Sequence, residues 1–348
     1  MEKAARELHR HIPQTIEVRL VKWSGSNKWL PIVLPSLLLK ALWISIFDRI
    51  TVIYVQDGLL APLGCFLKIL GKPVVITIHG LDITYSNRIY QFLIPRCVGK
   101  LDKVICVSSA TKGECVKRGV SQEKVAVIQN GVSDSFYMGL GVEEGWELRR
   151  ALSMELGIDL NKKHILLSAG RLVERKGIHW FVRDVMPAIV AGRGDCVYLI
   201  VGEGVYRGKI RKVIHETGLE EHVFILGHVS DEMLSRLYNI ADIFVMPNIP
   251  VEGDMEGFGL VALEAASCEL PVVASSLEGI EEAIEDRGSG FLVEPSDAHE
   301  FVSIINWLLE DDARTREFAE NARSLVLTNY GWEYISQRYL EEFLGVQG

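Results

Sequence analysis

The stretch Glu256-Gly-Phe-Gly-Leu-Val-Ala-Leu-Glu264 joins a glycine-containing loop to an apolar helical pattern. Gly257 and Gly259 let the backbone approach a ligand, and the first N–H groups of a helix have no partner within it. Such a junction favours the binding of a phosphate. Glu256 stays on the loop, whereas Glu264 lies about two turns along the helix. Carboxylates on both sides of a phosphate site suit a nucleotide sugar, which carries a diphosphate between a sugar and a ribose.

Short β-branched runs alternate with helical patterns on both sides of this stretch, which indicates an α/β protein with parallel sheets covered by helices. Strands are predicted at residues 16–21, 51–55, 74–78, 103–107, 125–128, 164–168, 196–201, 223–226, 243–246, 271–274 and 291–293. Helices are predicted at residues 178–190, 231–240, 260–268 and 298–309.

The chain is long enough, at 348 residues, for two domains. A polar stretch after Asn130 delays the next strand and places the junction within residues 133–160. We expect residues 1–145 to form the first domain and residues 146–330 the second. Residues 331–348 are expected to form a helix that crosses back onto the first domain.

The start of the first domain departs from a doubly wound sheet, which normally begins with a strand and a glycine-rich turn. Here an amphipathic helical pattern comes first, from Met1 to Leu8. Without the first strand, two neighbouring strands would lack a partner along their inner edges, at about 1–3 kcal/mol for each buried unpaired backbone group. We therefore expect a further strand before Met1. The alternative is a sheet that closes the gap under strain.

The segment from Trp29 to Phe47 is apolar enough to raise the question of a membrane helix. Pro31, Pro35 and Lys40 argue against a helix that spans the bilayer. The favoured prediction is a buried helix that begins near Ser36. The alternative is a partly exposed helix in the membrane interface. Its flanks would supply Lys22, Trp23, Lys28, Trp29 and Arg49.

Charge is divided unevenly along the chain. Residues 1–130 hold 18 Lys and Arg against 9 Asp and Glu, and the remaining residues hold 19 against 37. A basic first half predicts an anionic partner, either a phospholipid surface or a phosphorylated acceptor. Six scattered cysteines without a C-x-x-C pair, and an N-terminus that does not read as a secretory signal, predict a cytoplasmic protein.

Arg171 and Lys176 flank the turn that follows the predicted strand 164–168. Arginine can bind two phosphate oxygens at once, and lysine adds a mobile point charge beside them. The pair could neutralise a departing nucleoside diphosphate, which is the task of a divalent ion in other transferases.

His79 stands at the carboxyl end of a predicted buried strand, directly before Gly80. Open α/β sheets bind their ligands at this edge. A lone histidine is usually structural, but this placement favours a hydrogen bond to a sugar or help with a proton.

Other kinds of site find less support in the sequence. Gly202-Glu203-Gly204 lacks the spacing of a dinucleotide fingerprint. Asp254-Met255-Glu256 is better explained by the motif described above than as a metal-binding Asp-x-Asp. We find no zinc spacing, Ser/His/Asp set or basic patch interleaved with aromatic residues, so nucleic acid is not an expected partner.

These motifs together resemble the retaining GT-B glycosyltransferases of family 4. In the second half the resemblance rests on Gly170-Arg171, Lys176-Gly177, Val201-Gly202-Glu203-Gly204, the Gly227 loop, 241–247, 256–264, Gly279-Ile280-Glu281-Glu282 and Gly290-Phe291-Leu292-Val293. In the first half it rests on His79-Gly80-Leu81-Asp82, Cys106-Val107-Ser108 and Asn130-Gly131-Val132. The family's first strand and Gly-Gly loop have no counterpart, because Met1-Glu2 aligns with the residues that follow them.

The resemblance implies the GT-B architecture, in which two Rossmann-like parallel-sheet domains face each other across a cleft. The first domain would bind the acceptor and the second the donor. Arg171 and Lys176 would bind the donor diphosphate, Glu256 the sugar hydroxyls and Glu264 the ribose. His79 would contact the donor sugar from the other domain. Further donor contacts would come from Gly204, Gly227, Val229, Gly257, Phe258, Gly259 and Leu260.

The resulting hypothesis is transfer of a hexose from a UDP or GDP sugar to a glycan or lipid-linked acceptor. By resemblance the anomeric configuration is retained, a leaving phosphate oxygen takes the acceptor's proton, and neither a metal nor another cofactor takes part. The expected place is the cytoplasm, including the inner face of the membrane. The alternatives are a non-catalytic homologue that binds nucleotide sugars or docks on membranes, and a sugar-nucleotide epimerase of the same architecture.

Overall fold

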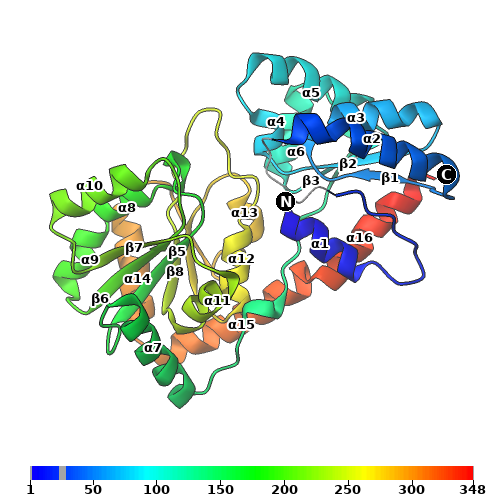
Figure 1. Cartoon of the computed structure of the whole chain (residues 1–348). Coiled ribbons are helices and arrows are strands. Elements are labelled where there is room, and N and C mark those ends of the chain that lie inside the picture. Colours follow the sequence, from blue (N-terminus) through cyan, green and yellow to red (C-terminus); the bar gives the residue numbers. More distant parts are fainter. Residues whose placement is uncertain (1, 23–28, 348) are drawn as a thin grey trace. The chain divides into compact units, whose positions relative to one another are not determined.

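A computed structural model describes residues 2–22 and 29–347 and divides the chain into two compact units (Figure 1). The first unit contains the chain up to Gly131 and from Trp332 onward, and the second unit is Val132–Gly331. Residues 132–145, which we expected in the first domain, therefore lie in the second unit. The C-terminal helix α16 (Trp332–Gly345) lies in the first unit.

The first unit is built on a parallel sheet with the strand order β1-β2-β3-β4. Its strands are β1 (Ile53–Val55), β2 (Val74–Ile78), β3 (Lys103–Cys106) and β4 (Val125–Val127). Every residue of β2 is buried, as expected for a strand that is covered on both faces. Each described strand pairs with the next one in sequence, so the expected gap inside the sheet does not occur among the described residues.

Helices cover both faces of this sheet. On one face, α3 (Ala61–Leu67) and α5 (Arg88–Lys100) form a core with Val74 and Ile76. On the other face, α1 (Glu2–His11) and α16 form a core with Val75, because alternate residues of a strand point to opposite faces. The other elements are α2 (Leu30–Phe47), α4 (Leu81–Thr84), α6 (Ser109–Lys117), and the 3-10 turns η2 (Gly58–Leu60), η3 (Lys68–Leu70) and η4 (Gln122–Lys124).

Two predictions for the first unit are wrong. Residues 16–21 form no regular element, and Ile16, Val18 and Leu20 are exposed. Their alternating pattern is that of a strand, but no neighbouring strand pairs with them in the described part of the chain. Helix α2 begins at Leu30 rather than near Ser36, and it is not buried, since Leu39 and Trp43 are 67% and 66% exposed.

The second unit contains a six-stranded parallel sheet with the order β10-β9-β8-β5-β6-β7. Its strands are β5 (His164–Ala169), β6 (Cys196–Val201), β7 (Val223–Gly227), β8 (Ile243–Met246), β9 (Val272–Ser275) and β10 (Phe291–Val293). Successive strands add outward from β5 on one side and from β8 on the other, so the order reverses between β5 and β8. In open α/β sheets ligands bind at the carboxyl ends of the strands beside such a reversal.

Helices enclose the second sheet and bury a large apolar core. They are α7 (Val142–Leu156), α8 (Ile178–Asp184), α9 (Met186–Gly192), α10 (Arg207–Thr217), α11 (Asp231–Ile240), α12 (Leu260–Ser267), α13 (Ile280–Ala283), α14 (Ala298–Leu309) and α15 (Asp312–Tyr330), with the 3-10 turns η5 (Asp134–Phe136) and η6 (Glu174–Lys176). The helix predicted at 178–190 is two helices, because Pro187 cannot continue the first and begins the second.

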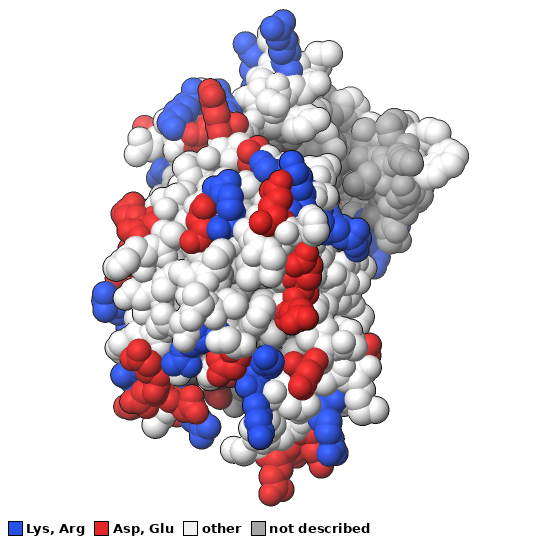
Figure 2. All heavy atoms as spheres, turned by 90° about the vertical axis from the view of Figure 1, so that its left-hand side faces the viewer, with Lys and Arg blue, Asp and Glu red and all other residues white. Residues whose placement is uncertain are grey.

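The surface seen from the side of α9 and α10 carries acidic and basic side chains interspersed (Figure 2). This face has no extended field of one sign. None of the helices in the described part of the chain has the length and apolar character needed to cross a bilayer.

Candidate functional site at the carboxyl ends of the second sheet

Lys176 and Glu256, which lie 80 positions apart in the sequence, meet where the strand order reverses. Lys176 ends the turn η6 after β5, and Glu256 lies in the loop between β8 and α12. Lys176 Nζ is 2.6 Å from Glu256 Oε2, and each side chain is only 11% exposed. Two strand ends that are neighbours in the sheet thus bring a buried cation and a buried carboxylate together.

The turn before Lys176 depends on Gly177, whose φ of +64° is favoured only by glycine. A Cβ atom at Gly177 would lie 1.7 Å from the carbonyl oxygen of Pro247, the residue after β8. The close approach of these two backbones carries Lys176 to the end of β8. The position after Lys176 therefore requires glycine, since any side chain there would collide with Pro247.

Arg175, to which the sequence analysis assigned no role, contacts three consecutive residues of the loop that carries Glu256. It is buried, its Nε donates to the Met255 carbonyl at 3.2 Å, and it pairs with Asp254 at 3.2 Å. Its Nη1 lies 3.5 Å from Glu256 Oε2. Only its position next to Lys176 pointed to it in the sequence.

Asn248 and Glu278 also hold Glu256 and were not predicted. Asn248 Nδ2 donates to Glu256 Oε2 at 3.1 Å, and the backbone N–H of Glu256 donates to Glu278 Oε2 at 2.5 Å. Asn248 is a polar residue two positions after the buried strand β8, and this placement could have identified it. Glu278 has a φ of +53°, a left-handed conformation that is unusual for glutamate and that nothing in the sequence reveals.

The charges of this cluster favour an ionised Glu256. Burial alone would raise the pKa of the Glu256 carboxyl, but Lys176 and Arg175 outweigh it, and its pKa lies below the usual value. Burial lowers the pKa of Lys176, against the effect of Glu256, and the charges of Arg175 and Arg171 add to the lowering. Burial raises the pKa of Glu278, whereas the N–H of Glu256 acts in the other direction.

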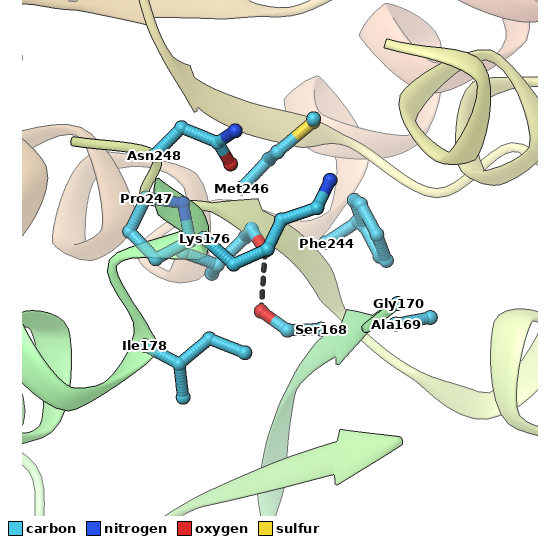
Figure 3. A pocket seen from close by; sticks show the side chains of 10 residues that line it. Ser168, Ala169, Gly170, Lys176, Ile178, Phe244, Met246, Pro247 and Asn248 are labelled. Atoms are coloured by element: carbon cyan, nitrogen blue, oxygen red, sulfur yellow. Dashed lines mark hydrogen bonds between the residues drawn. The ribbon is translucent and has the colours of Figure 1, made fainter. Parts of the chain in front are cut away.

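A small pocket opens beside this ion pair at the end of β5 and β8 (Figure 3). Ser168, Lys176 and Asn248 line it from three different elements, together with apolar residues such as Phe244 and Met246. Within the described part of the chain, the buried atoms Arg175 Nη1 and Asn248 Oδ1 have no hydrogen-bond partner. Buried polar atoms without partners are costly unless a ligand or water satisfies them.

The loop from Glu256 to α12 has the predicted junction. Gly259 is the N-cap residue of α12, Phe258 is buried against Tyr330, and the Leu260 N–H donates to the Phe258 carbonyl. Glu264 is buried in α12, where its carboxylate accepts a hydrogen bond of 3.4 Å from Tyr238.

The remaining predicted donor contacts lie on neighbouring strand ends. A Cβ at Gly204 would come within 2.2 Å of the Leu172 carbonyl oxygen, so the loops after β5 and β6 are in close contact. Gly227 ends β7 with a φ of +76°, and Val229 follows it half-buried. Arg171 is exposed at the start of the loop after β5.

His79 lies in the first unit, directly after β2. Its backbone N–H donates to Asp82 Oδ1 at 2.8 Å, and its ring Nε2 lies 3.1 Å from the Gln56 carbonyl oxygen. Burial lowers the pKa of His79 to about 4, which makes the ring neutral at pH 7 with Nε2–H as the donor to Gln56. Burial likewise raises the pKa of Asp82, to about 7.

No group of three or more His, Cys, Asp or Glu side chains could hold a metal ion among residues 2–22 and 29–347.

Two parallel-sheet α/β units, the second with a charged pocket beside its strand-order reversal, define the GT-B fold. Solved structures share it: Anabaena HepE in complex with UDP and glucose superposes with a TM-score of 0.75 over 99% of this chain and 89% of that chain, at 23% identity. Sucrose-phosphate synthase from Thermosynechococcus elongatus gives a TM-score of 0.71 at 23% identity, over 92% and 80% of the two chains.

The sequence comparisons agree with the fold. Residues 2–136 match the family model described as Glycosyltransferase Family 4, and residues 155–325 match the one described as Glycosyl transferases group 1. An uncharacterized glycosyltransferase of Methanocaldococcus jannaschii is 29% identical over 83% of this chain and 74% of its own length. A GDP-mannose-dependent monoacylated α-(1-6)-phosphatidylinositol monomannoside mannosyltransferase of Corynebacterium glutamicum is 26% identical over 96% and 86%.

The chain therefore belongs to the group 1 and family 4 glycosyltransferases, and glycosyl transfer is its general activity. This confirms the family and the fold that the motifs indicated.

Proposed function

We propose that the chain transfers a hexose from a nucleoside diphosphate sugar to a glycan or lipid-linked acceptor, with retention of configuration and without a metal ion. The observation that carries the proposal is the buried contact between Lys176 and Glu256 beside the pocket at the reversal of strand order. A UDP-glucose complex among the similar structures and a GDP-mannose-dependent enzyme among the relatives support a donor of this class.

The residues of the pocket divide the work on the donor. Lys176, with Arg171 at the mouth of the same loop, neutralises the negative charge that grows on the leaving diphosphate. Glu256, ionised and oriented by Asn248 and Arg175, accepts hydrogen bonds from the sugar hydroxyls. Glu264 takes the ribose hydroxyls and the glycine-rich turn before α12 takes the sugar and phosphate. When the donor binds, Lys176 and Glu256 exchange their contact with each other for contacts with the donor.

The acceptor's proton goes to an oxygen of the departing phosphate, which needs no side chain as general base. This is consistent with a neutral His79, whose low pKa makes it a hydrogen-bonding residue rather than an acid at neutral pH. In this proposal, attack from the side of the departing phosphate retains the donor's configuration, and Lys176 with Arg171 takes the place of a metal ion.

The test is release of nucleoside diphosphate from UDP-glucose and GDP-mannose by the intact chain. Glu256→Gln is expected to lower the rate by about tenfold to a hundredfold, as for a lost charged hydrogen bond. Lys176→Met is expected to lower it by about a hundredfold or more, as for a lost transition-state contact. A chelator is expected to leave the rate unchanged. The product anomer, read by NMR with a methyl glycoside acceptor, is expected to keep the donor's configuration.

Lys212→Met and Glu216→Gln are the matched controls, because these residues form an exposed ion pair on α10 in the same unit. They are expected to retain the full rate. Binding of a nucleotide sugar without turnover, an inverted product or a rate abolished by the chelator would each contradict a part of the proposal.

A further inference from the structure

The backbone of Glu256 is held by two consecutive residues of the loop between β9 and α13. Its N–H donates to Glu278 Oε2 at 2.5 Å, and its carbonyl oxygen accepts from the Gly279 N–H at 3.2 Å. Both backbone groups of Glu256 are therefore paired with the same loop. The carboxylate of Glu256 is held separately, by the side chains after β5 and β8 described above.

The two loops are in direct backbone contact. A Cβ atom at Gly279 would lie 2.2 Å from the Gly257 carbonyl oxygen and 3.0 Å from that of Glu256. A side chain at position 279 would therefore push the two loops apart. Glycine at this position allows the preceding residue, Glu278, to come within hydrogen-bond distance of the Glu256 N–H.

Glu278 makes this contact from a backbone conformation that is unfavourable for glutamate. The turn from Leu277 to Ile280 is closed by the Ile280 N–H, which donates to the Leu277 carbonyl at 3.0 Å. Glu278 is the second residue of this turn and has a φ of +53°, where a turn normally takes glycine. Of the other four non-glycine residues with a positive φ in the described chain, three are exposed, whereas Glu278 is half-buried. Because glycine would form the same turn without strain, the turn alone does not explain a glutamate at this position.

The charges around Glu278 are also unfavourable for a carboxylate. Burial is the main reason that the pKa of Glu278 is raised, and the negative charges of Glu256 and Asp254 raise it further. The N–H of Glu256 and the charge of Arg175 act in the other direction. Strained residues that the surrounding structure holds in place occur mainly at functional sites, where the conformation serves the geometry of the site. The conformation and the surroundings of Glu278 therefore indicate a role in the site that contains Glu256.

We propose that Glu278 is a positioning residue for the donor sugar: together with Gly279 it fixes the backbone at Glu256 and thereby orients the Glu256 carboxylate toward the sugar hydroxyls. This inference rests on the proposed function, in which Glu256 binds the sugar. Glu278 touches no reacting atom and acts only through Glu256. Because the nucleoside diphosphate is bound by other residues, the loss of Glu278 weakens recognition of the sugar and leaves recognition of the diphosphate intact.

The experiment is calorimetric titration of the intact wild type and of Glu278→Gly with UDP, UDP-glucose, GDP and GDP-mannose. For the donor that the wild type binds, Glu278→Gly is expected to weaken binding of the nucleotide sugar by about tenfold, as for a lost charged hydrogen bond. Its affinity for the corresponding free diphosphate is expected to be unchanged. The variant is expected to unfold near the wild-type temperature, because relief of the strained φ offsets the greater freedom of glycine in the unfolded chain.

The matched control is Glu269→Gly. Glu269 is also half-buried, has a φ of +57° and accepts a hydrogen bond from the Tyr137 hydroxyl at 2.8 Å. It lies beyond the C-terminal end of α12, whereas the Glu256 loop lies before the N-terminal end of this helix. Glu269→Gly is expected to bind the nucleotide sugar and the free diphosphate like the wild type. The conservative variant Glu278→Gln, whose amide oxygen can still accept from the Glu256 N–H, is expected to recover most of the affinity that Glu278→Gly loses.

Equal affinities of the wild type and Glu278→Gly for the nucleotide sugar would overturn this inference. An equal loss of affinity for the nucleotide sugar and for the free diphosphate would also overturn it, because Glu278 would then support the whole pocket rather than orient Glu256. In both cases the wild type still binds the donor, so the proposed function stands. Failure of the wild type to bind either nucleotide sugar would instead contradict the proposed function, and this inference with it.

Discussion

Lys176 and Glu256 form a buried ion pair, in which each charge compensates the other. Both side chains are 11% exposed, and Arg175 is the other cation close to the carboxylate. Removing one member of a buried ion pair leaves an uncompensated charge, which costs much more than the loss of a pair at the surface. The loss of either side chain is therefore expected to destabilise the fold as well as the site.

The first prediction follows from this burial. Lys176→Met is expected to lower the free energy of unfolding by about 3 kcal/mol, whereas Lys212→Met in the exposed pair with Glu216 is expected to lower it by less than about 1 kcal/mol. Urea denaturation of both variants measures the difference. Equal shifts in the two unfolding midpoints would show that the pair is solvated rather than buried.

Asp82 gives a second prediction, which concerns pH. Its pKa is raised by burial to about 7 in the folded chain, so the folded state binds a proton more tightly than the unfolded state between about pH 4 and pH 7. Stability from this group is present below about pH 4 and is lost as the pH rises through about 7, by about 4 kcal/mol at most. Asp57 beside it has a pKa raised by burial and acts in the same direction.

Asp82→Asn, which cannot ionise, is therefore expected to gain stability relative to wild type on going from about pH 5 to about pH 8. Asp82 Oδ1 accepts from the His79 N–H and Oδ2 from the Gly58 N–H, and the single oxygen of asparagine can keep only one of these bonds, so the change in stability with pH is compared rather than the stability itself. Urea midpoints of the two proteins at both pH values provide the measurement. A stability difference that does not change with pH would be the contrary result.

The sequence predicted some residues of the site better than others, for a physical reason. Lys176, Gly257 and Glu256 belong to short motifs in which spacing alone places a charge or a glycine on a turn. Asn248 and Glu278 act on Glu256 through the fold, from eight and 22 positions away. Such contacts depend on which strand ends are neighbours, and local pattern does not contain that information.

Among the elements, the junction of β5 with η6 and the loop after β8 matter most. They lie on either side of the strand-order reversal, and Gly177 lets one backbone touch the other. Strands buried on both faces were predicted to within a residue or so, because their apolar runs are continuous. The segment 16–21 and helix α2 were predicted wrongly. An alternating or apolar pattern indicates a strand or a buried helix only if other elements pack against it, and in the described part of the chain no strand pairs with 16–21 and no element covers the exposed side of α2.

Gly177 and Gly218 have nearly the same backbone conformation but different surroundings. Replacing each by alanine therefore distinguishes the effect of a steric contact from the effect of backbone strain. Gly177 and Gly218 have φ values of +64° and +65°, but a Cβ at Gly218 would meet no atom within 4 Å. Gly218→Ala is expected to cost about 1 kcal/mol, the price of a left-handed alanine. Gly177→Ala is expected to cost clearly more and to weaken donor binding, because it pushes η6 away from Pro247.

Thermal unfolding and donor titration of these two variants make the comparison. If Gly177→Ala and Gly218→Ala lost the same stability and both bound the donor normally, the contact between the turn and Pro247 would have no part in building the site.

The molecule as a whole consists of two units with separate sheets and separate cores. The chain passes between them at Gly131 and again at Gly331, where Val132 pairs with Gly331 and its N–H donates to the Tyr330 carbonyl at 2.8 Å. The predicted junction lay later because the polar stretch after Asn130 is a local signal. The true boundary depends on a pairing between residues about 200 positions apart.

The central claim is that the pocket between β5 and β8 in the second unit binds a nucleoside diphosphate sugar. Hydrogen exchange of the intact chain, with and without UDP-glucose or GDP-mannose, tests it most directly. The account predicts slower exchange in the segments 170–177 and 248–260 with one of these donors, and loss of this protection in Lys176→Met but not in Lys212→Met. Protection confined to the first unit, or no protection by either donor, would contradict it.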